Sequence, residues 1–254
     1  MSKLPKAHQF TDLSDYGRPI ARIIAKSLKF TRFTPVDVTI AFVISGLVGV
    51  YCIVEGYYWA AAFFLIFKSI LDAADGELAR VKETPSYTGR FLDSVSDIIL
   101  NFIILSTIGY LTNTHFGYIL LAFFGIQLQG TLYNYYYVIL RNRFAGDTTS
   151  RVFEDKTPVA LPGEKQKNVT VLFFIYKALY GIFDEIIYAL DKNAPEGKPF
   201  PNWLMTLIST FGLGFQLLII SVFLVLNLKE LIIPFFIGSS VLVFVFIGIR
   251  KIFY

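Results

Sequence analysis

The sequence predicts an all-α, polytopic membrane protein. Of its 254 residues, 55% are hydrophobic and only 17% are charged, whereas a soluble domain usually carries about 25% charged residues. Several apolar runs reach roughly 20 residues, enough to cross a hydrocarbon core about 30 Å thick as a helix. Lysine and arginine also gather in alternate connections between these runs, which is typical of membrane spans.

We expect six membrane-spanning helices, placed by the apolar runs. They cover residues 36–55, 58–79, 91–110, 117–140, 203–226 and 231–249. The connections 56–57 and 111–116 contain no Lys or Arg, and the connection 227–230 contains only Lys229. By the positive-inside rule, both termini and the connection between the second and third spans should therefore face the cytoplasm.

Two further helices are expected to lie in the membrane interface. Residues 14–30 carry basic side chains along one side and aliphatic ones along the other, as a helix on an anionic leaflet does. Residues 169–190 repeat polar and small residues at steps of three and four, which favours the interface over a seventh span. We expect a cytoplasmic amphipathic segment at 1–33 and a single membrane domain at 34–254, with a cytoplasmic loop at 142–202.

Acidic residues gather between the second and third spans. Asp72 and Asp75 are three residues apart, and Asp93 and Asp97 are four apart, so each pair shares one helix face. A short turn can bring the two faces together, and their carboxylates suit Mg²⁺ or Mn²⁺, as one ion or two. A solvated loop rich in ion pairs is the competing interpretation, but acids so close repel each other unless a cation lies between them.

Small residues lie beside these acids, namely Gly76, Ala79 and Gly89. They leave room for a flat ligand to approach the backbone. Tight packing of membrane helices uses the same residue types, so spacing alone supports both interpretations equally.

The run D-x-x-D-G-x-x-A-R-x(8)-G-x-x-x-D-x-x-x-D resembles the signature of the CDP-alcohol phosphotransferase family, also called CDP-alcohol phosphatidyltransferases. The matching positions are Asp72, Asp75, Gly76, Ala79, Arg80, Gly89, Asp93 and Asp97. The resemblance implies a metal-dependent transferase of phospholipid synthesis. A substituted phosphate would move from a CDP-linked donor to an acceptor alcohol, releasing CMP and forming a phosphodiester.

The resemblance also implies a role for each residue of the signature. The implied metal ligands are Asp72, Asp75, Asp93 and Asp97. Asp97 is also the implied general base, with Asp93 beside it in catalysis. The implied nucleotide contacts are Asp75, Gly76, Ala79, Arg80 and Gly89. Glu77 and Glu83 fall outside the signature and are expected to be solvated or paired with nearby Lys and Arg.

One segment departs from the family pattern. Many relatives carry T-P-N-x-x-T before the first span, whereas this chain has "TPVDVT" at 34–39, with Val36 in the place of Asn. We therefore carry no role onto this segment.

The signature leaves donor and acceptor open. The donor is either CDP-diacylglycerol with a soluble alcohol as acceptor, or CDP-choline or CDP-ethanolamine with diacylglycerol. Candidate substrate contacts are Lys68, Tyr133, Tyr136, Arg141 and Arg143. The tyrosines could surround an ammonium group or form an interfacial belt, and the arginines could bind an acceptor phosphate or anchor the span.

Two other classes of function compete with the enzyme. Intramembrane carboxylates also mark the ion paths of cation transporters and channels, but such acids would recur along several spans. No Asp or Glu occurs at 117–146 or 203–229. A non-catalytic lipid-binding protein is a third option. As partners we expect membrane lipids and a second copy in a homodimer, and no nucleic acid.

Overall fold

The structure is a computed structural model that describes residues 4–5, 8–144, 156–198 and 200–253. The regular elements assigned in these ranges are all helices. In chain order they are η2 (Leu13–Asp15), α1 (Arg18–Leu28), α2 (Pro35–Val54), α3 (Tyr58–Lys82), α4 (Tyr87–Leu111), α5 (Phe116–Arg143), α6 (Gln166–Leu190), α7 (Asn202–Ile208), η3 (Ser209–Phe211), α8 (Leu213–Val225), η4 (Lys229–Leu231), α9 (Ile232–Ser239) and α10 (Val241–Phe253).

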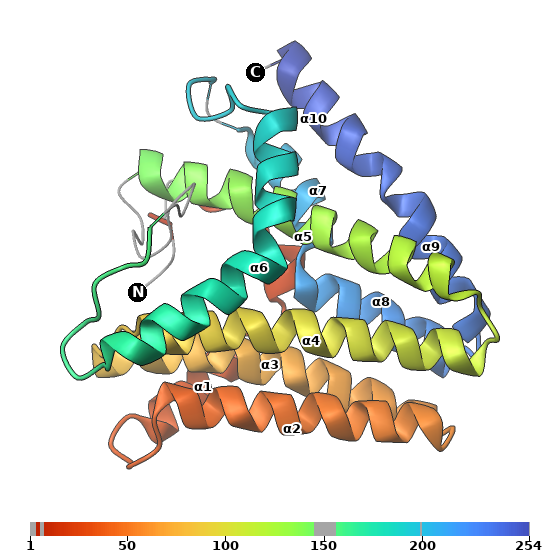
Figure 1. The fold of residues 1–254 in the computed structure, drawn as a ribbon, viewed down its shortest axis with the longest axis horizontal. Coiled ribbons are helices and arrows are strands. Elements are labelled where there is room, and N and C mark those ends of the chain that lie inside the picture. Colours follow the sequence, from red (N-terminus) through yellow and green to blue (C-terminus); the bar gives the residue numbers. More distant parts are fainter. Residues whose placement is uncertain (1–3, 6–7, 145–155, 199, 254) are drawn as a thin grey trace.

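Helix α2 lies beside both α3 and α4, and α1 and α8 pack against α3 (Figure 1). Helix α2 begins where the sequence departs from the family pattern. Thr34 and Asp37 form a capping box, and Pro35 occupies the first helical turn, where its missing N–H costs nothing. The segment "TPVDVT" is therefore a helix start, whether or not it also contacts a ligand.

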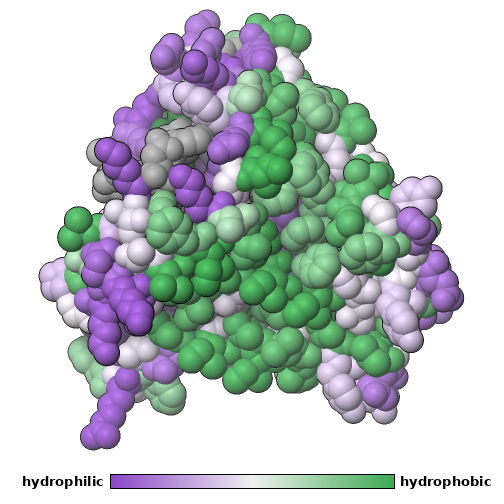
Figure 2. Space-filling view, in the orientation of Figure 1, coloured by the Kyte–Doolittle hydropathy of each residue, from purple (hydrophilic) through white to green (hydrophobic). Residues whose placement is uncertain are grey.

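The apolar helices are those of an integral membrane protein. Four helical stretches of the described chain are long and apolar enough to span a membrane: Pro35–Val54, Tyr87–Leu111, Phe116–Arg143 and Lys229–Phe253. On α2, Ile40 and Ile44 lie one turn apart and are 50% and 57% exposed, as expected of a lipid-facing stripe. Figure 2 shows apolar side chains across the centre of one face, with hydrophilic ones towards its margins.

The predicted count of six spans is not confirmed. Among the described residues the structure has four candidate spans, or five if the pair Asn202–Phe211 and Leu213–Val225 is one bent span. The predicted span 58–79 is present as helix α3, but it carries Lys68, Asp72 and Asp75 within its apolar part. Helix α3 is long enough to span a membrane, but these charges exclude it from the four candidate spans.

The predicted span 203–226 is also not one straight helix. It bends by 56° between η3 and α8, at Gly212. A Cβ at Gly212 would lie 2.2 Å from Oγ of Ser14, and a Cβ at Gly214 would lie 2.1 Å from the Ser14 carbonyl oxygen. The N-terminal segment therefore packs into the bend, which only glycine permits at these positions.

The two helices predicted for the interface are both present. Helix α1 buries Ala21 and Ala25 against α3 and leaves Ile20 and Ile23 more than half exposed, at 51% and 67%. Helix α6 crosses α4 and α5 (Figure 1). Their position relative to the membrane stays a prediction. Residues 145–155 of the predicted cytoplasmic loop lie outside the described residues.

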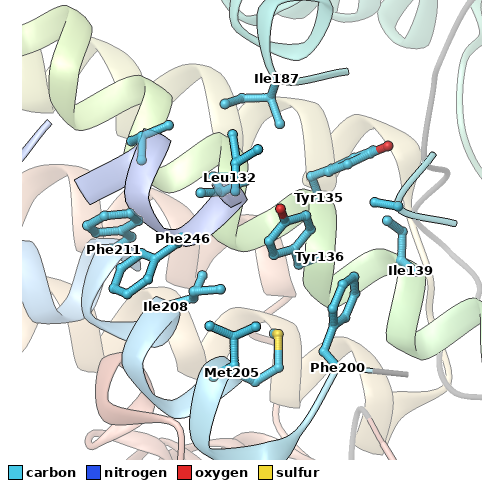
Figure 3. Packing of buried hydrophobic residues seen from close by; sticks show 14 of the residues in the cluster. Leu132, Tyr135, Tyr136, Ile139, Ile187, Phe200, Met205, Ile208, Phe211 and Phe246 are labelled. Carbon is cyan, nitrogen blue, oxygen red and sulfur yellow. The ribbon is translucent and has the colours of Figure 1, made fainter. Parts of the chain in front are cut away.

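A hydrophobic core joins the helices of the C-terminal half of the chain. It is shown in Figure 3 and includes Leu132, Tyr135, Tyr136, Ile139, Ile187, Phe200, Met205, Ile208, Phe211 and Phe246. These residues come from α5, α6, α7, η3 and α10 and from the loop before α7. The core holds α5 and α6 in place beside α4, and these two helices form the second wall of the site described next.

Candidate functional site

A cavity of about 1500 Å³ lies between α3, α4, α5 and α6 and is bounded on one side by the N-terminal segment. The connection between α3 and α4 explains its position. Glu83 ends α3 in the left-handed conformation, at φ 57°, and the Ser86 hydroxyl caps α4 by accepting from the Gly89 amide. This short turn brings the acidic faces of α3 and α4 to the same cavity.

Three of the predicted ligands form one compact group. One carboxylate oxygen from each of Asp72, Asp75 and Asp93 lies within 4.8 Å of the others. Oδ1 of Asp93 is buried and has no hydrogen-bond partner, which leaves it available to a cation. Thr39 donates a hydrogen bond to Oδ2 of Asp75 over 2.7 Å and so orients that carboxylate. An all-oxygen donor set of this kind fits Mg²⁺ or Mn²⁺.

The fourth predicted ligand has a different neighbour. Asp97 lines the cavity, but its Oδ1 accepts a hydrogen bond from Nζ of Lys68. Lys68 is fully buried and lies over the Phe42 ring, 4.9 Å from its centroid. The sequence predicts Lys68 as a substrate contact. In the structure Lys68 is not on the cavity wall, because its ammonium group is hydrogen-bonded to Asp97.

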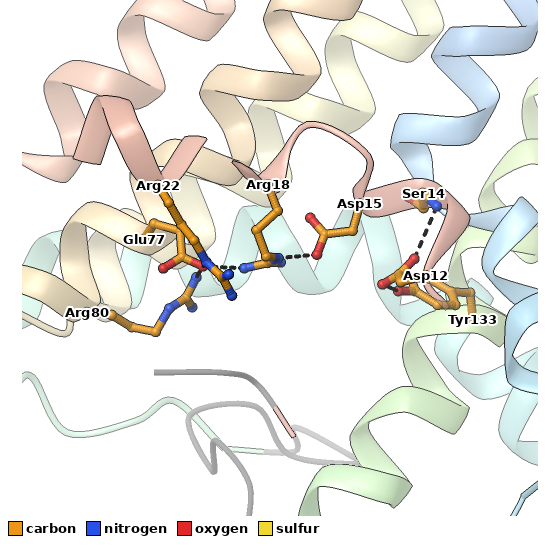
Figure 4. A network of polar contacts seen from close by, with 8 residues as sticks. All are labelled: Asp12, Ser14, Asp15, Arg18, Arg22, Glu77, Arg80 and Tyr133. Atoms are coloured by element: carbon orange, nitrogen blue, oxygen red, sulfur yellow. Dashed lines mark hydrogen bonds and ion pairs between the residues drawn. The ribbon is translucent and has the colours of Figure 1, made fainter. Parts of the chain in front are cut away.

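Arg80 belongs to an ion-pair network centred on Glu77 (Figure 4). Glu77 is buried on α3, and its Oε1 accepts from Arg18 at 2.5 Å and from Arg80 at 3.1 Å, with Arg22 at 3.8 Å. The network fastens α1 to α3 and places two arginines on the cavity wall.

The small residues of the signature line the same cavity. Gly76, Ala79 and Gly89 are all on its wall. A Cβ at Gly76 would meet only the Arg80 guanidinium, at 3.6 Å, and a Cβ at Gly89 would lie 3.3 Å from Oγ of Ser86. Among the described residues, no other helix places an atom within 4 Å of this Cβ position, which favours ligand approach over helix packing at Gly76.

The predicted substrate contacts on α5 divide into two groups. Tyr133 and Arg141 line the cavity, and the Tyr133 hydroxyl donates to Asp12 over 2.5 Å. Tyr136 and Arg143 are not brought to the cavity. The Tyr136 hydroxyl donates to the buried Asp191, which also pairs with Arg250, and Arg143 donates to two carbonyls of the loop after α6.

Helix α6 contributes site residues that the sequence reasoning missed. Tyr176, Tyr180 and Asp184 line the cavity, and the rings of the two tyrosines stack 5.1 Å apart. Their spacing of four residues places them on one face of α6. That spacing is visible in the sequence, but the interfacial helix was predicted from another set of residues, Lys177, Gly181, Asp184 and Tyr188, and no site role was predicted for Tyr176 or Tyr180.

Glu164, just before α6, contacts the start of α4. Its carboxylate accepts from the Ser86 hydroxyl and from the amides of Tyr87, Thr88 and Leu161. Burial raises the pKa of Glu164, but these hydrogen bonds outweigh it and hold the pKa below its ordinary value of 4.5. The loop before α6 is thereby fixed beside the α3–α4 turn.

We predict that Glu164→Gln lowers the free energy of unfolding by about 1 kcal/mol at pH 7, because it weakens a charged cap. A lowered pKa means that the ionised form stabilises the fold above the ordinary pKa and that this contribution is lost as pH falls through the folded value. The gap between wild type and variant should therefore close below pH 4.5. Thermal unfolding in detergent at several pH values measures it, with the exposed Glu196→Gln as control. A gap that persists in acid would contradict this account.

A family model for CDP-alcohol phosphatidyltransferases matches residues 24–212. The chain belongs to the CDP-alcohol phosphatidyltransferase family. The match covers α2 to α7, and with them the acidic faces of α3 and α4. A comparison with curated proteins finds no significant match.

The CDP-alcohol phosphatidyltransferase family is a family of transferases of phospholipid synthesis that use divalent metals. The group of Asp72, Asp75 and Asp93 is where such a metal fits. The family match gives no support to the cation-transporter hypothesis.

Proposed function

We propose that this protein transfers a substituted phosphate from a CDP-linked donor to an acceptor alcohol, with a divalent metal held by Asp72, Asp75 and Asp93. The observation that carries the proposal is the compact group of three carboxylates, one of them with an unpartnered oxygen, on the wall of a large cavity. We further propose that this cavity faces the cytoplasm, as the distribution of basic residues predicts.

When bound, the metal would neutralise charge on the donor pyrophosphate and polarise the phosphorus under attack. Asp97 acts as the general base. Lys68 occupies its Oδ1, so Oδ2 takes the proton from the acceptor hydroxyl. The acceptor oxygen then bonds to the phosphorus of the substituted phosphate, the bond from that phosphorus to the bridging oxygen breaks, and CMP leaves with the bonding electrons.

The nucleotide lies against Gly76, Ala79 and Gly89 in this proposal. Arg80 is held by Glu77 at the edge of the same wall, so its guanidinium group is fixed before the donor arrives. Fixed positive charge beside a phosphate binds it without a cost of reorganisation.

We predict that Gly76→Ala reduces CMP release by about tenfold or more, through a raised KM for the donor, because a methyl group would fill the space assigned to the nucleotide. The fold should tolerate the change, since the nearest atoms to the new Cβ are 3.6 Å away. Steady-state kinetics with varied donor measures the effect. Gly181→Ala on α6 is the matched control, because its Cβ also has its nearest neighbour at 3.6 Å and it lies off the cavity wall. Equal kinetics for the two variants would remove Gly76 from the nucleotide site.

Two sets of side chains favour different substrate pairs. Tyr176, Tyr180 and Asp184 on α6 offer aromatic rings and a carboxylate, which suit an ammonium group such as that of choline or ethanolamine. Arg90 and Arg141 also line the cavity and suit an acceptor that carries its own phosphate.

A substrate panel scored by CMP release tests the proposal. CDP-diacylglycerol is offered with serine, glycerol 3-phosphate, inositol or inositol phosphate, and CDP-choline or CDP-ethanolamine is offered with diacylglycerol. Release of CMP with one pair identifies donor and acceptor. Ion flux through the protein in liposomes, with no CMP released from any pair, would replace the proposed function with the transporter.

A further inference from the structure

The walls of the cavity change from charged to neutral along α4 and α5. On α4, Asp97 is followed by Asn101, which lies one turn further along the same face and also lines the cavity. On α5, Arg141 lines the cavity near the end of the helix, and Thr131 and Gln127 line it several turns earlier. Among the described residues, those that line the cavity between Arg141 and Gln127 are all neutral. We call Asn101, Gln127 and Thr131 the neutral end of the cavity.

Packing between α4 and α5 brings the two walls of the neutral end together. The Phe102 and Phe123 rings are 5.2 Å apart between centroids. Asn101 directly precedes Phe102, and Gln127 lies one turn after Phe123, so the two amide side chains lie within about one helical turn of the same level. Both are buried, at 8% and 5% exposure.

Gln127 has a hydrogen-bond donor that the protein does not use. Its Nε2 is buried and has no hydrogen-bond partner, although its side chain lines the cavity. A buried amide N–H without an acceptor is destabilising, and folded proteins keep few of them. The donor therefore indicates that a ligand supplies the acceptor.

Gln129, two residues further along α5, shows what a structural glutamine looks like in this helix. It is also buried, but its Nε2 donates to Oγ of Ser239 over 2.9 Å, and its Oε1 accepts from Nε2 of Gln216 over 3.2 Å. Such bonds join helices inside a membrane protein. Gln127 makes no such bond through its Nε2, so helix packing does not explain this group.

The space beside Gln127 is open. Gly130 lies three residues along α5, on the same face, and also lines the cavity. A Cβ at Gly130 would have its nearest neighbour 3.9 Å away, at the carbonyl oxygen of Phe211. A ligand can therefore approach the Gln127 amide along this face of the helix.

The neutral end fits the glycerol part of a diacyl lipid. Its side chains carry no charge, whereas serine and glycerol 3-phosphate do, and the apolar residues Ile126 and Leu213 line the cavity as well. An ester carbonyl accepts hydrogen bonds and donates none, as the Gln127 amide requires. It also lies only a few bonds from the oxygen that carries the phosphate. Asn101 lies about 6 Å along α4 from Asp97, the proposed base, so the two ends of the cavity are close enough to hold both parts of one lipid.

We infer that Gln127 donates a hydrogen bond from Nε2 to an ester carbonyl of a diacylglycerol group, and that it thereby selects ester-linked over ether-linked lipids. This inference rests on the proposed function and deepens it, because a diacylglycerol group occurs in both candidate substrate pairs, as part of the donor or as the acceptor. Gln127 is a specificity-determining residue and takes no part in the transfer itself.

Lipid binding to the full-length protein tests the inference. The protein is placed in nanodiscs of ether-linked phosphatidylcholine, which contain no ester carbonyl. It is offered dioleoylglycerol or CDP-dioleoylglycerol, with Mg²⁺ and without a second substrate, and each probe is compared with its ether-linked analogue. For at least one probe we expect the ether analogue to bind the wild type about tenfold more weakly, because Gln127 then stays unpaired.

Infrared spectroscopy provides a second measurement on the same samples. A hydrogen bond from the protein lowers the stretching frequency of a ¹³C-labelled ester carbonyl. We expect a bound carbonyl band at lower frequency in the wild type and its loss in Gln127→Met, which keeps the length of the side chain but removes the N–H group. Gln127→Met should bind ester and ether forms within about twofold of each other and should be at least as stable as the wild type, since it removes an unpaired buried donor.

Gln129→Met is the matched control and should show the opposite behaviour. Its unfolding temperature should fall, because Gln216 and Ser239 lose a partner, but the shifted band and the preference for the ester should persist. If it does not fold, Ser106→Ala replaces it, because Oγ of Ser106 is buried without a partner on α4 and lies off the cavity wall. If Gln127→Met does not fold, the band and the ester preference of the wild type decide.

A shifted band with dioleoylglycerol supports the inference with the lipid as acceptor, and one with CDP-dioleoylglycerol supports it with the lipid as donor. Equal binding of ester and ether forms by the wild type would overturn it, and so would an unchanged band in folded Gln127→Met. CMP release separates these outcomes from a failure of the proposed function. A shifted band without CMP release from any pair means that the proposed function fails and the ester contact stands. CMP release without an ester preference leaves the proposed function in place and removes this inference.

Discussion

Asp93→Asn is expected to reduce CMP release by about 10³-fold, the largest loss among the variants considered, because it removes a metal ligand at the reacting phosphate. The folded protein should survive, since the change also removes one of four mutually repelling charges. Without metal, the variant should unfold at the same temperature as the wild type or higher. With saturating Mn²⁺, only the wild type should gain stability, by about 2.7 kcal/mol at a hundredfold excess over Kd.

Initial rates of CMP release and thermal unfolding with and without Mn²⁺ measure these effects. Glu55→Gln is the matched control, because Glu55 is an exposed acid at the end of α2 and lies off the cavity wall. An active Asp93→Asn variant would show that this carboxylate neither holds the metal nor takes part in transfer.

Glu77→Gln is expected to lower the free energy of unfolding by about 3 kcal/mol, because it removes the one anion shared by three arginines. The Glu77 side chain is only 3% exposed, and those of Arg18 and Arg80 are 15% and 21% exposed, so water screens these two pairs poorly. Arg22 is 50% exposed and should contribute little. Since the network fastens α1 to α3 and fixes Arg80, CMP release should fall as well (Figure 4).

Chemical or thermal unfolding in detergent checks the stability change. Glu185→Gln on α6 removes an exposed glutamate and should change stability by less than about 0.5 kcal/mol. A double variant, Glu77→Gln with Arg18→Gln, should lose less than the sum of the single changes, because the two residues are partners. Full additivity would mean that the ion pair between them does not stabilise the fold.

The apolar runs were sufficient to predict an all-helical membrane protein and the positions of most helices. They were not sufficient to predict the number of spans. Helix α3 is apolar at its start but carries the charged residues of the site, Lys68, Asp72 and Asp75. Composition alone cannot distinguish a membrane span that carries site residues from a helix that does not span the membrane. The bend at Gly212 depends on contact with Ser14, about two hundred positions away, which no local pattern contains.

The sequence predicts that four acids meet. In the structure three of them, Asp72, Asp75 and Asp93, lie together, whereas Asp97 is hydrogen-bonded to Lys68. The sequence does not predict the partners that hold these acids. Thr39 and Lys68 are ordinary residues of apolar helices until packing places them beside Asp75 and Asp97. Packing also decides the role of Tyr136. The sequence predicts it as a substrate contact, but its hydroxyl donates a hydrogen bond to Asp191.

Metal-dependent release of CMP tests the central claim most directly. The purified protein is stripped with EDTA, offered the substrate panel, and then given Mg²⁺ or Mn²⁺. We expect no CMP before the metal is restored and release from one donor and acceptor pair afterwards, with Asp93→Asn inactive throughout. Release of CMP from the stripped protein at the full rate, or no release from any pair with metal present, would contradict the account.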